Sequence, residues 1–183
     1  MRLIPAAALL ICLVASTLSA SPLSASPLAG HDFSFTAIEG ESLPLNDYAG
    51  HPVLVVNTAS LCAYTPQYYA LQALQDTYAP RGLVVLAVPS DDFNQELASA
   101  AEVKEFCALN YNLTLPMTEI THVKGPQAHP FYQWLAAEHG FTPGWNFNKV
   151  LIGPDGAVVE TWGSNTTPMS AKITSQIERL LAP

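Results

Sequence analysis

The sequence predicts an α/β domain in which a central mixed β-sheet is flanked by helices. Residues 53–58 and 83–88 are unbroken runs of apolar, largely β-branched side chains, as is typical of strands buried on both faces of a sheet. Each run is followed by a segment with apolar residues at helical spacing, at 67–78 and 99–109. Strands that alternate with helices in this way favour parallel pairing of the two strands.

The remaining segments complete a single domain. Alternating apolar and polar residues at 32–38, followed by a turn, predict an N-terminal β-hairpin. The turn of Pro154 and Gly156 separates two strands of a second hairpin, which gives the sheet its antiparallel part. The predicted elements are strands at 32–38, 115–120, 149–153 and 158–162 and helices at 130–139 and 170–181.

The first 20 residues are predicted to be a signal peptide. Arg2 precedes an apolar run at 3–18, and small residues follow it. The run is short for a membrane span, and Ile11 before Cys12 does not fit a lipoprotein signal. We expect cleavage between residues 20 and 29, a folded domain over 31–183, and a secreted or periplasmic protein. An uncleaved N-terminal anchor is the alternative.

Composition limits the partners of this domain. Seven Lys and Arg side chains stand against fifteen Asp and Glu, for a formal net charge of −8. A chain with no basic stripe is not expected to bind nucleic acid. The five histidines do not show the spacing of zinc or copper ligands, so we expect neither a metal nor a cofactor.

Cys62 is the candidate nucleophile. It lies in the loop that follows the strand at 53–58, just before a helix that Thr65 is expected to cap, with Pro66 in the first turn. Free amides at a helix N-terminus stabilise a thiolate. A buried strand followed by such a loop is the arrangement of thioredoxin-like folds. A disulfide oxidoreductase would have a second cysteine at 65, and threonine there favours attack on a small oxidant to give a sulfenic acid.

The segments VVNTASLCAYTPQY at 55–68 and WNFNK at 145–149 resemble the two signature motifs of the glutathione peroxidase family. The resemblance covers nearly all of residues 31–183. It implies a thioredoxin-like fold and a peroxidase in which Cys62 attacks the peroxide. It also implies that Trp145 and Asn146 donate hydrogen bonds to the sulfur, which would stabilise the thiolate.

One segment departs from the family's pattern. Asp92 occupies the position of a glutamine that completes the site in many members, and Ser90 replaces a cysteine. An ionised carboxylate beside a thiolate would raise both pKa values. Asp92 is therefore expected to be protonated or to point away, and Gln95 is a nearby substitute for the missing amide.

The reductant is a thiol in this family. Members that use thioredoxin-like donors resolve the sulfenic acid with a second cysteine on the following helix, and Cys107 lies in that region. Cys107 also fits a core position beside Val103 and Phe106. The few cations make a site for the two carboxylates of glutathione less favourable, so we expect a thioredoxin-like protein rather than glutathione.

The resemblance also implies a monomer that accepts hydrogen peroxide and organic or lipid hydroperoxides, since the stretch before Trp145 lacks the long insertion of tetrameric members. Two other functions fit the same residues. One is a peroxide-sensing thiol–disulfide relay protein. The other is a secreted domain with a degenerate site and a structural Cys62–Cys107 disulfide.

Overall fold

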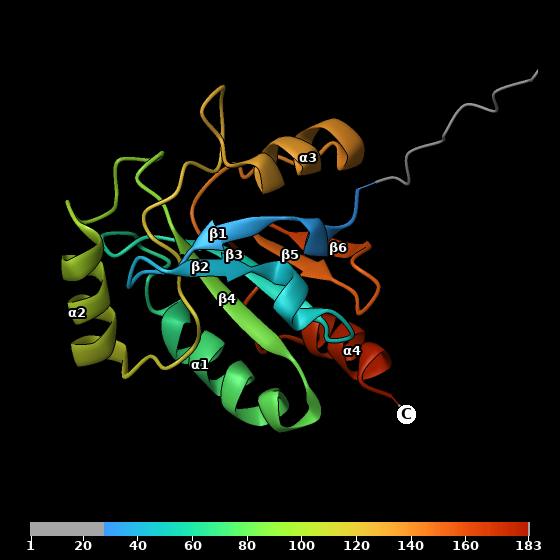
Figure 1. Ribbon diagram of the computed structural model, residues 1–183. Helices are drawn as coiled ribbons and strands as arrows, with labels where there is room; N and C mark the ends of the chain where they lie inside the picture. The colour runs from blue at the N-terminus through green and yellow to red at the C-terminus, as the bar shows by residue number, and fades with distance from the viewer. Residues whose placement is uncertain (1–27, 183) are drawn as a thin grey trace, which may run out of the picture.

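The computed structural model describes residues 28–182, which form a central sheet with helices on both faces (Figure 1). The sheet has the strand order β4-β3-β5-β6 and a separate two-stranded hairpin, β1-β2, precedes it. The strands are β1 (Ser34–Thr36), β2 (Ser42–Pro44), β3 (Val53–Thr58), β4 (Val84–Pro89), β5 (Lys149–Ile152) and β6 (Val158–Trp162), and the α-helices are α1 (Gln67–Tyr78), α2 (Ala100–Tyr111), α3 (Pro130–His139) and α4 (Ala171–Leu180).

Strand β3 is the centre of the sheet. It pairs in parallel with β4, with Val53 opposite Val84, and antiparallel with β5, with Val53 opposite Ile152. All six of its residues are buried, as its apolar sequence predicts. The sheet is therefore mixed, and its parallel pair ends at the edge where the loop of Cys62 begins.

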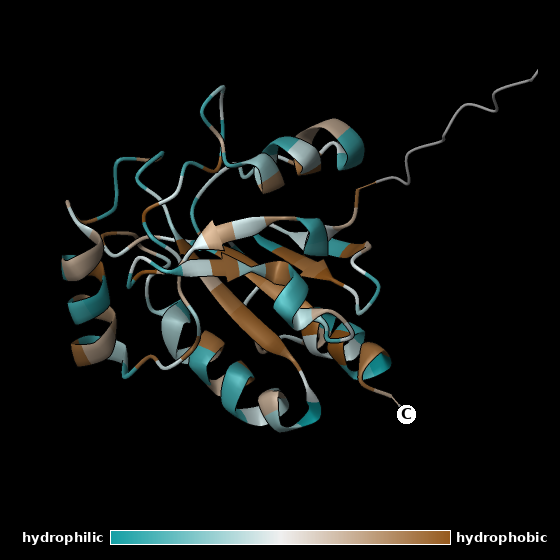
Figure 2. Cartoon of the chain, viewed as in Figure 1, coloured by the Kyte–Doolittle hydropathy of each residue, from teal (hydrophilic) through white to brown (hydrophobic). Residues whose placement is uncertain are grey.

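Two buried clusters lie on opposite faces of the sheet. One packs α1, α2 and α4 against β-strand residues such as Leu54 and Val85. The other packs α3 and the β1-β2 hairpin against residues such as Val55 and Leu86. The central strands β3 and β4 are among the most hydrophobic segments, and the helices mix hydrophilic and hydrophobic residues (Figure 2). Alternate residues of the strands thus supply both cores.

Most predicted elements are confirmed, including the N-terminal hairpin. The predicted strand at 115–120 is wrong: its residues make only isolated bridges, Met117 to Ala87 and Thr118 to Ala37. The segment crosses from the edge of β4 to the hairpin, and its few backbone hydrogen bonds to each do not repeat as a ladder. Pro116 has no N–H with which to extend a ladder.

The helix starts show one further difference. Ser99 caps α2 by accepting a hydrogen bond from Glu102 N, and His129 caps α3 through Phe131 N. The predicted cap of α1 is wrong, because Pro66 occupies the cap position and the Thr65 side chain bonds elsewhere.

The predicted signal peptide lies outside the described residues. Within residues 28–182, no helix has both the length and the apolar character that crossing a bilayer requires.

Candidate active site

The loop after β3 holds Cys62 in a turn that is braced by Thr65. Thr65 Oγ1 donates to the carbonyl of Ala59 at 2.8 Å and accepts from Cys62 N at 3.0 Å. The thiol is buried, with 8% of the residue exposed, and its Sγ accepts a hydrogen bond from Tyr64 N at 3.4 Å. An amide that donates to sulfur favours the thiolate form. The turn itself supplies this donor, and Cys62 lies five residues before α1 begins at Gln67.

A second loop, between β4 and α2, holds the Cys62 loop from the other side. Leu61 N donates to the carbonyl of Gln95 at 2.9 Å, and Ser60 N donates to Glu96 Oε1 at 3.0 Å. The Glu96 carboxyl is buried, and burial raises its pKa. Residues 95–96 therefore fix the backbone on the N-terminal side of Cys62.

Asn57 of β3 anchors the segment that carries Trp145 and Asn146. Its side chain donates to the carbonyl of Trp145 at 3.0 Å and accepts from Asn148 N at 3.0 Å, and its own carbonyl accepts from Phe147 N. Phe147 has a φ of +60°, a conformation that costs a non-glycine residue energy and persists because its surroundings enforce it. The strand that leads to Cys62 thus also fixes the tryptophan motif.

Gln95 connects the two halves of the site. Its Oε1 accepts from Asn146 Nδ2 at 3.0 Å, while its backbone carbonyl accepts from Leu61 N. Asn146 is fully buried, and its Oδ1 has no partner within the described residues. Trp145 is 42% exposed and packs against Phe93, with 5.2 Å between ring centroids. One residue thus joins the Cys62 loop to Asn146, with Trp145 at the adjoining surface.

Asp92 binds another part of the chain. Its Oδ1 lies 2.7 Å from His122 Nδ1, and its Oδ2 accepts from Val123 N and Lys124 N. Burial favours the neutral acid, but the hydrogen bonds from His122 and the two amides outweigh it and lower the pKa of Asp92. Asp92 is therefore committed to residues 122–124, and of the two alternatives expected for it, protonated or pointing away, the structure favours the second.

Cys107 is a residue of α2 whose side chain is buried in the core. It is 2% exposed, and burial raises its pKa to about 11. Both Cys62 and Cys107 are free thiols in residues 28–182, so the structural disulfide considered as an alternative is absent from this fold. The raised pKa favours the neutral thiol of Cys107 over the thiolate.

Two residues of the site were not singled out from the sequence. Asn57 interrupts an otherwise apolar strand, and a polar side chain at a position buried on both faces was the available signal. Lys149 is fully buried; its Nζ donates to Gln67 Oε1 and to the carbonyl of Phe147. A lysine that opens an apolar strand gave no comparable signal.

Among the described residues, no three His, Cys, Asp or Glu side chains are grouped as a metal site.

The parallel pair β3-β4, the antiparallel β5-β6 and the cysteine loop after β3 define a thioredoxin-like domain with a one-cysteine redox site. The glutathione peroxidase family model matches residues 30–136. A glutathione peroxidase of Lactococcus lactis is 42% identical over 156 residues, covering 82% of this chain and 98% of the relative.

A hydroperoxy fatty acid reductase of Synechocystis is 39% identical over 165 residues, covering 82% of this chain and 95% of the relative. A crystal structure of Trgpx in apo form superimposes with a TM-score of 0.68 at 32% identity, covering 85% of this chain and 97% of that one. The chain belongs to the glutathione peroxidase family. It is a peroxidase, an oxidoreductase that takes a peroxide as oxidant and a thiol as reductant.

Proposed function

We propose that Cys62 reduces hydrogen peroxide and organic or lipid hydroperoxides through a sulfenic acid, in response to oxidative stress. The thiolate attacks one peroxide oxygen, an S–O bond forms and the O–O bond breaks. The departing alkoxide or hydroxide takes up a proton and leaves as an alcohol or water. Support comes from Gln95, which bonds both the Cys62 loop and Asn146 and so puts the nucleophile and the polar motif in one site.

The polar groups of this site have distinct proposed roles. Asn146 and the indole N–H of Trp145 donate to the sulfur and to the departing oxygen, which carries developing negative charge. Gln95 takes the place of the amide that the family has at position 92, because Asp92 is committed to residues 122–124. Asp92 is thereby removed from the proposed catalytic set.

A thiol then reduces the sulfenic acid. It attacks the sulfur, releases water and leaves a mixed disulfide, and a second thiol displaces Cys62 as the thiolate. We propose a thioredoxin-like protein as donor ahead of glutathione, because few cations are present for the tripeptide's carboxylates. Residues 1–20 direct the protein to a secreted or periplasmic location in this proposal, where it acts as a monomer.

One experiment tests the nucleophile and the return step together. The reduced protein is mixed with one equivalent of hydrogen peroxide and followed by stopped-flow tryptophan fluorescence and mass spectrometry. We expect Cys62 to be oxidised at least about 10²-fold faster than a free thiol. The accompanying fluorescence change should be absent in Cys62→Ser. Oxidation at the rate of a free thiol would refute the proposal. A Cys62–Cys107 bond in the product would make Cys107 the resolving thiol, and a persistent sulfenic acid would assign reduction to an external dithiol.

A further inference from the structure

The turn at 163–166, between β6 and α4, is bonded to the tryptophan motif and to the start of α1. Its first and last residues close it with a backbone hydrogen bond of 3.1 Å. Ser164 Oγ donates to the carbonyl of Asn146 at 2.6 Å and accepts from Asn148 Nδ2 at 3.0 Å. The carbonyl of Ser164 accepts from Gln67 Nε2 at 2.7 Å. Three hydrogen bonds on one residue therefore fix this turn beside the motif.

Asn165, the next residue, contacts the Cys62 loop. Its Oδ1 accepts a hydrogen bond from the phenol of Tyr64. Asn165 is exposed, whereas Tyr64 is half-buried and packs against the core cluster that contains Cys62. A side chain that is held at its far end leaves its own backbone fewer conformations. The bond to Asn165 therefore restricts the part of the loop that directly follows Cys62.

The backbone of Tyr64 carries the amide that donates to the sulfur. Tyr64 N lies 3.4 Å from Cys62 Sγ, and a hydrogen bond weakens steeply when its donor is turned away from the acceptor. Thr65 braces the turn at Cys62 N, but this bond does not involve Tyr64. Tyr64 itself is held by its carbonyl, which accepts from Gln67 N at 2.9 Å, and by its phenol. The direction of its N–H therefore depends on both of these bonds.

These contacts form a second connection between the two halves of the site. Gln95 joins Asn146 to the backbone that precedes Cys62. Ser164 and Asn165 join the same asparagine to the backbone that follows Cys62, through Tyr64. The nucleophile thus lies between two segments that are both referenced to the tryptophan motif.

We propose that Tyr64 and Asn165 are positioning residues for Cys62. Asn165, which Ser164 fixes to the tryptophan motif, holds the phenol of Tyr64 so that the Tyr64 N–H points at the sulfur. The inference rests on the proposed function of Cys62. Neither side chain takes part in the reaction with peroxide, and both act through an amide that stabilises negative charge on the sulfur. Loss of either side chain leaves that amide less well directed and slows the attack.

The first test is a double-mutant cycle on the rate of Cys62 oxidation. Reduced wild type, Tyr64→Phe, Asn165→Ala and the double variant are each mixed with hydrogen peroxide and followed by stopped-flow fluorescence. We expect each single variant to be about fivefold slower than wild type, which is the contribution of one hydrogen bond. The double variant should be no slower than either single variant, because both changes remove the same contact. Losses that multiply would show that the two residues act independently and would overturn the proposal.

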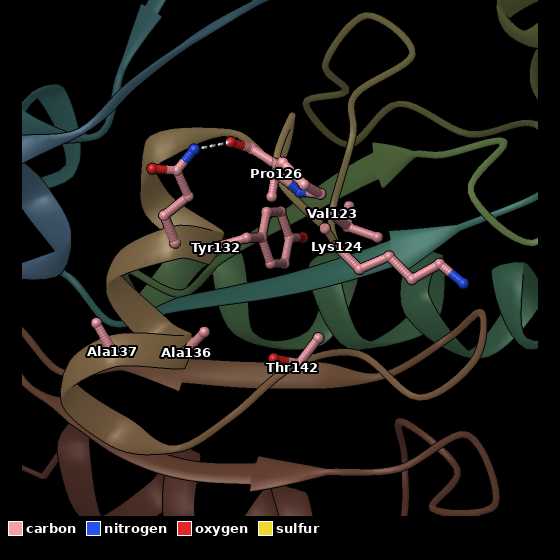
Figure 3. Close-up of a pocket in the computed structure, with 10 residues that line it drawn as sticks. Val123, Lys124, Pro126, Tyr132, Ala136, Ala137 and Thr142 are labelled. Atoms are coloured by element: carbon pink, nitrogen blue, oxygen red, sulfur yellow. Dashed lines mark hydrogen bonds between the residues drawn. The ribbon is translucent and has the colours of Figure 1, made fainter.

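Two control variants lose a comparable hydrogen bond elsewhere. Tyr69→Phe removes a phenol that donates to the carbonyl of Asn110 at 3.1 Å. Gln133→Ala removes a side chain that donates to the carbonyl of Ala128 at 2.7 Å, in a groove lined by α3 (Figure 3). We expect urea unfolding to show similar small losses of stability in the controls and the test variants, with Cys62 oxidised at the wild-type rate in the controls. Slower oxidation in a control would attribute the effect to lost stability and overturn the positioning role.

The amide proton of residue 64 gives a readout that a merely structural role would not move. In an NMR spectrum of the reduced protein its chemical shift should change in Cys62→Ser, because the sulfur is its acceptor. We expect Asn165→Ala to move the same resonance and to speed its exchange with solvent about fivefold, while Tyr69→Phe leaves both unchanged. An unmoved resonance in Asn165→Ala would overturn the proposal even if oxidation slowed.

The positioning role and the proposed function fail in different ways. Fast oxidation of Cys62 in wild type, with equal rates in Tyr64→Phe and Asn165→Ala, would overturn the positioning role alone. Oxidation of wild-type Cys62 no faster than a free thiol would overturn the proposed function. In that case the resonance of residue 64 would still show whether Asn165 directs the Tyr64 amide.

Discussion

At the scale of single residues, Asp92 is the clearest departure from the family's pattern. The sequence located it correctly but could not show where its carboxylate points. That direction depends on the backbone amides of Val123 and Lys124 and on His122, about thirty positions along the chain. These donors compensate the cost of burying a charge. An acidic side chain can therefore occupy this position without having to face the thiol of Cys62.

Replacing Asp92 with asparagine should change stability rather than chemistry. Because its pKa is lowered in the folded state, the carboxylate stabilises the protein above its unfolded pKa, and this contribution is lost as pH falls through the lower folded pKa. Urea unfolding should show a smaller loss of stability below about pH 4 in Asp92→Asn than in wild type. The rate of Cys62 oxidation at pH 7 should stay within about twofold. A large fall in that rate would show that the carboxylate takes part in the reaction.

Gln95 should matter for chemistry where Asp92 does not. Gln95→Ala removes the partner of Asn146 Nδ2 but keeps the backbone carbonyl that holds Leu61 N. We expect the second-order rate of Cys62 oxidation to fall about tenfold, which is the contribution of one well-placed hydrogen bond. Stopped-flow fluorescence measures that rate. Gln127→Ala, which changes an exposed glutamine, is the control, and equal rates in the two variants would contradict the prediction.

At the scale of elements, apolar periodicity was enough to place the helices and the buried strands within a few residues. It failed where a segment forms one isolated bridge to each of two neighbours, as Met117 and Thr118 do, because isolated bridges leave no repeating pattern. It also failed at Thr65, since the residue type favours a cap but the side chain braces the Cys62 turn. The motifs named Cys62, Trp145 and Asn146, but the contacts that bring them together through Gln95 exist only in the folded chain.

The segment at 145–148 depends on Asn57 of β3 more than on its own sequence. Asn57→Ala deletes the side-chain bonds to the carbonyl of Trp145 and to Asn148 N; the carbonyl keeps its bond from Asn148 Nδ2, but the buried Asn148 N loses its partner. We expect a loss of about 2–4 kcal/mol in the free energy of unfolding. Trp145 fluorescence should shift and Cys62 oxidation should slow, because the strained turn at Phe147 loses its support.

Urea unfolding and stopped-flow fluorescence give the two readouts. Asn57→Asp keeps an acceptor for Asn148 N and loses the donor to Trp145, so its loss of unfolding free energy indicates how much each bond contributes. An unshifted Trp145 spectrum in Asn57→Ala would show that the segment holds its position without this strand.

At the scale of the whole molecule, Lys149 couples the sheet to α1 and to the tryptophan motif. Its Nζ bonds Gln67 Oε1 at 2.6 Å and the carbonyl of Phe147 at 2.8 Å, and burial lowers its pKa to about 7. The unfolded chain keeps the ordinary pKa near 10.5. Between these values the unfolded state binds more protons than the folded state, so raising the pH favours folding.

The stability of the whole domain should therefore respond to pH through this residue. We expect the free energy of unfolding of wild type, relative to Lys149→Met, to increase from pH 7 to pH 9 by up to about 1.4 kcal/mol per pH unit. Taking the difference cancels groups that titrate alike in both proteins, such as Cys107. Urea unfolding at pH 6, 7, 8 and 9 measures it. A difference that does not vary with pH would mean that the ammonium stays charged inside the fold, with Gln67 and Phe147 compensating its burial.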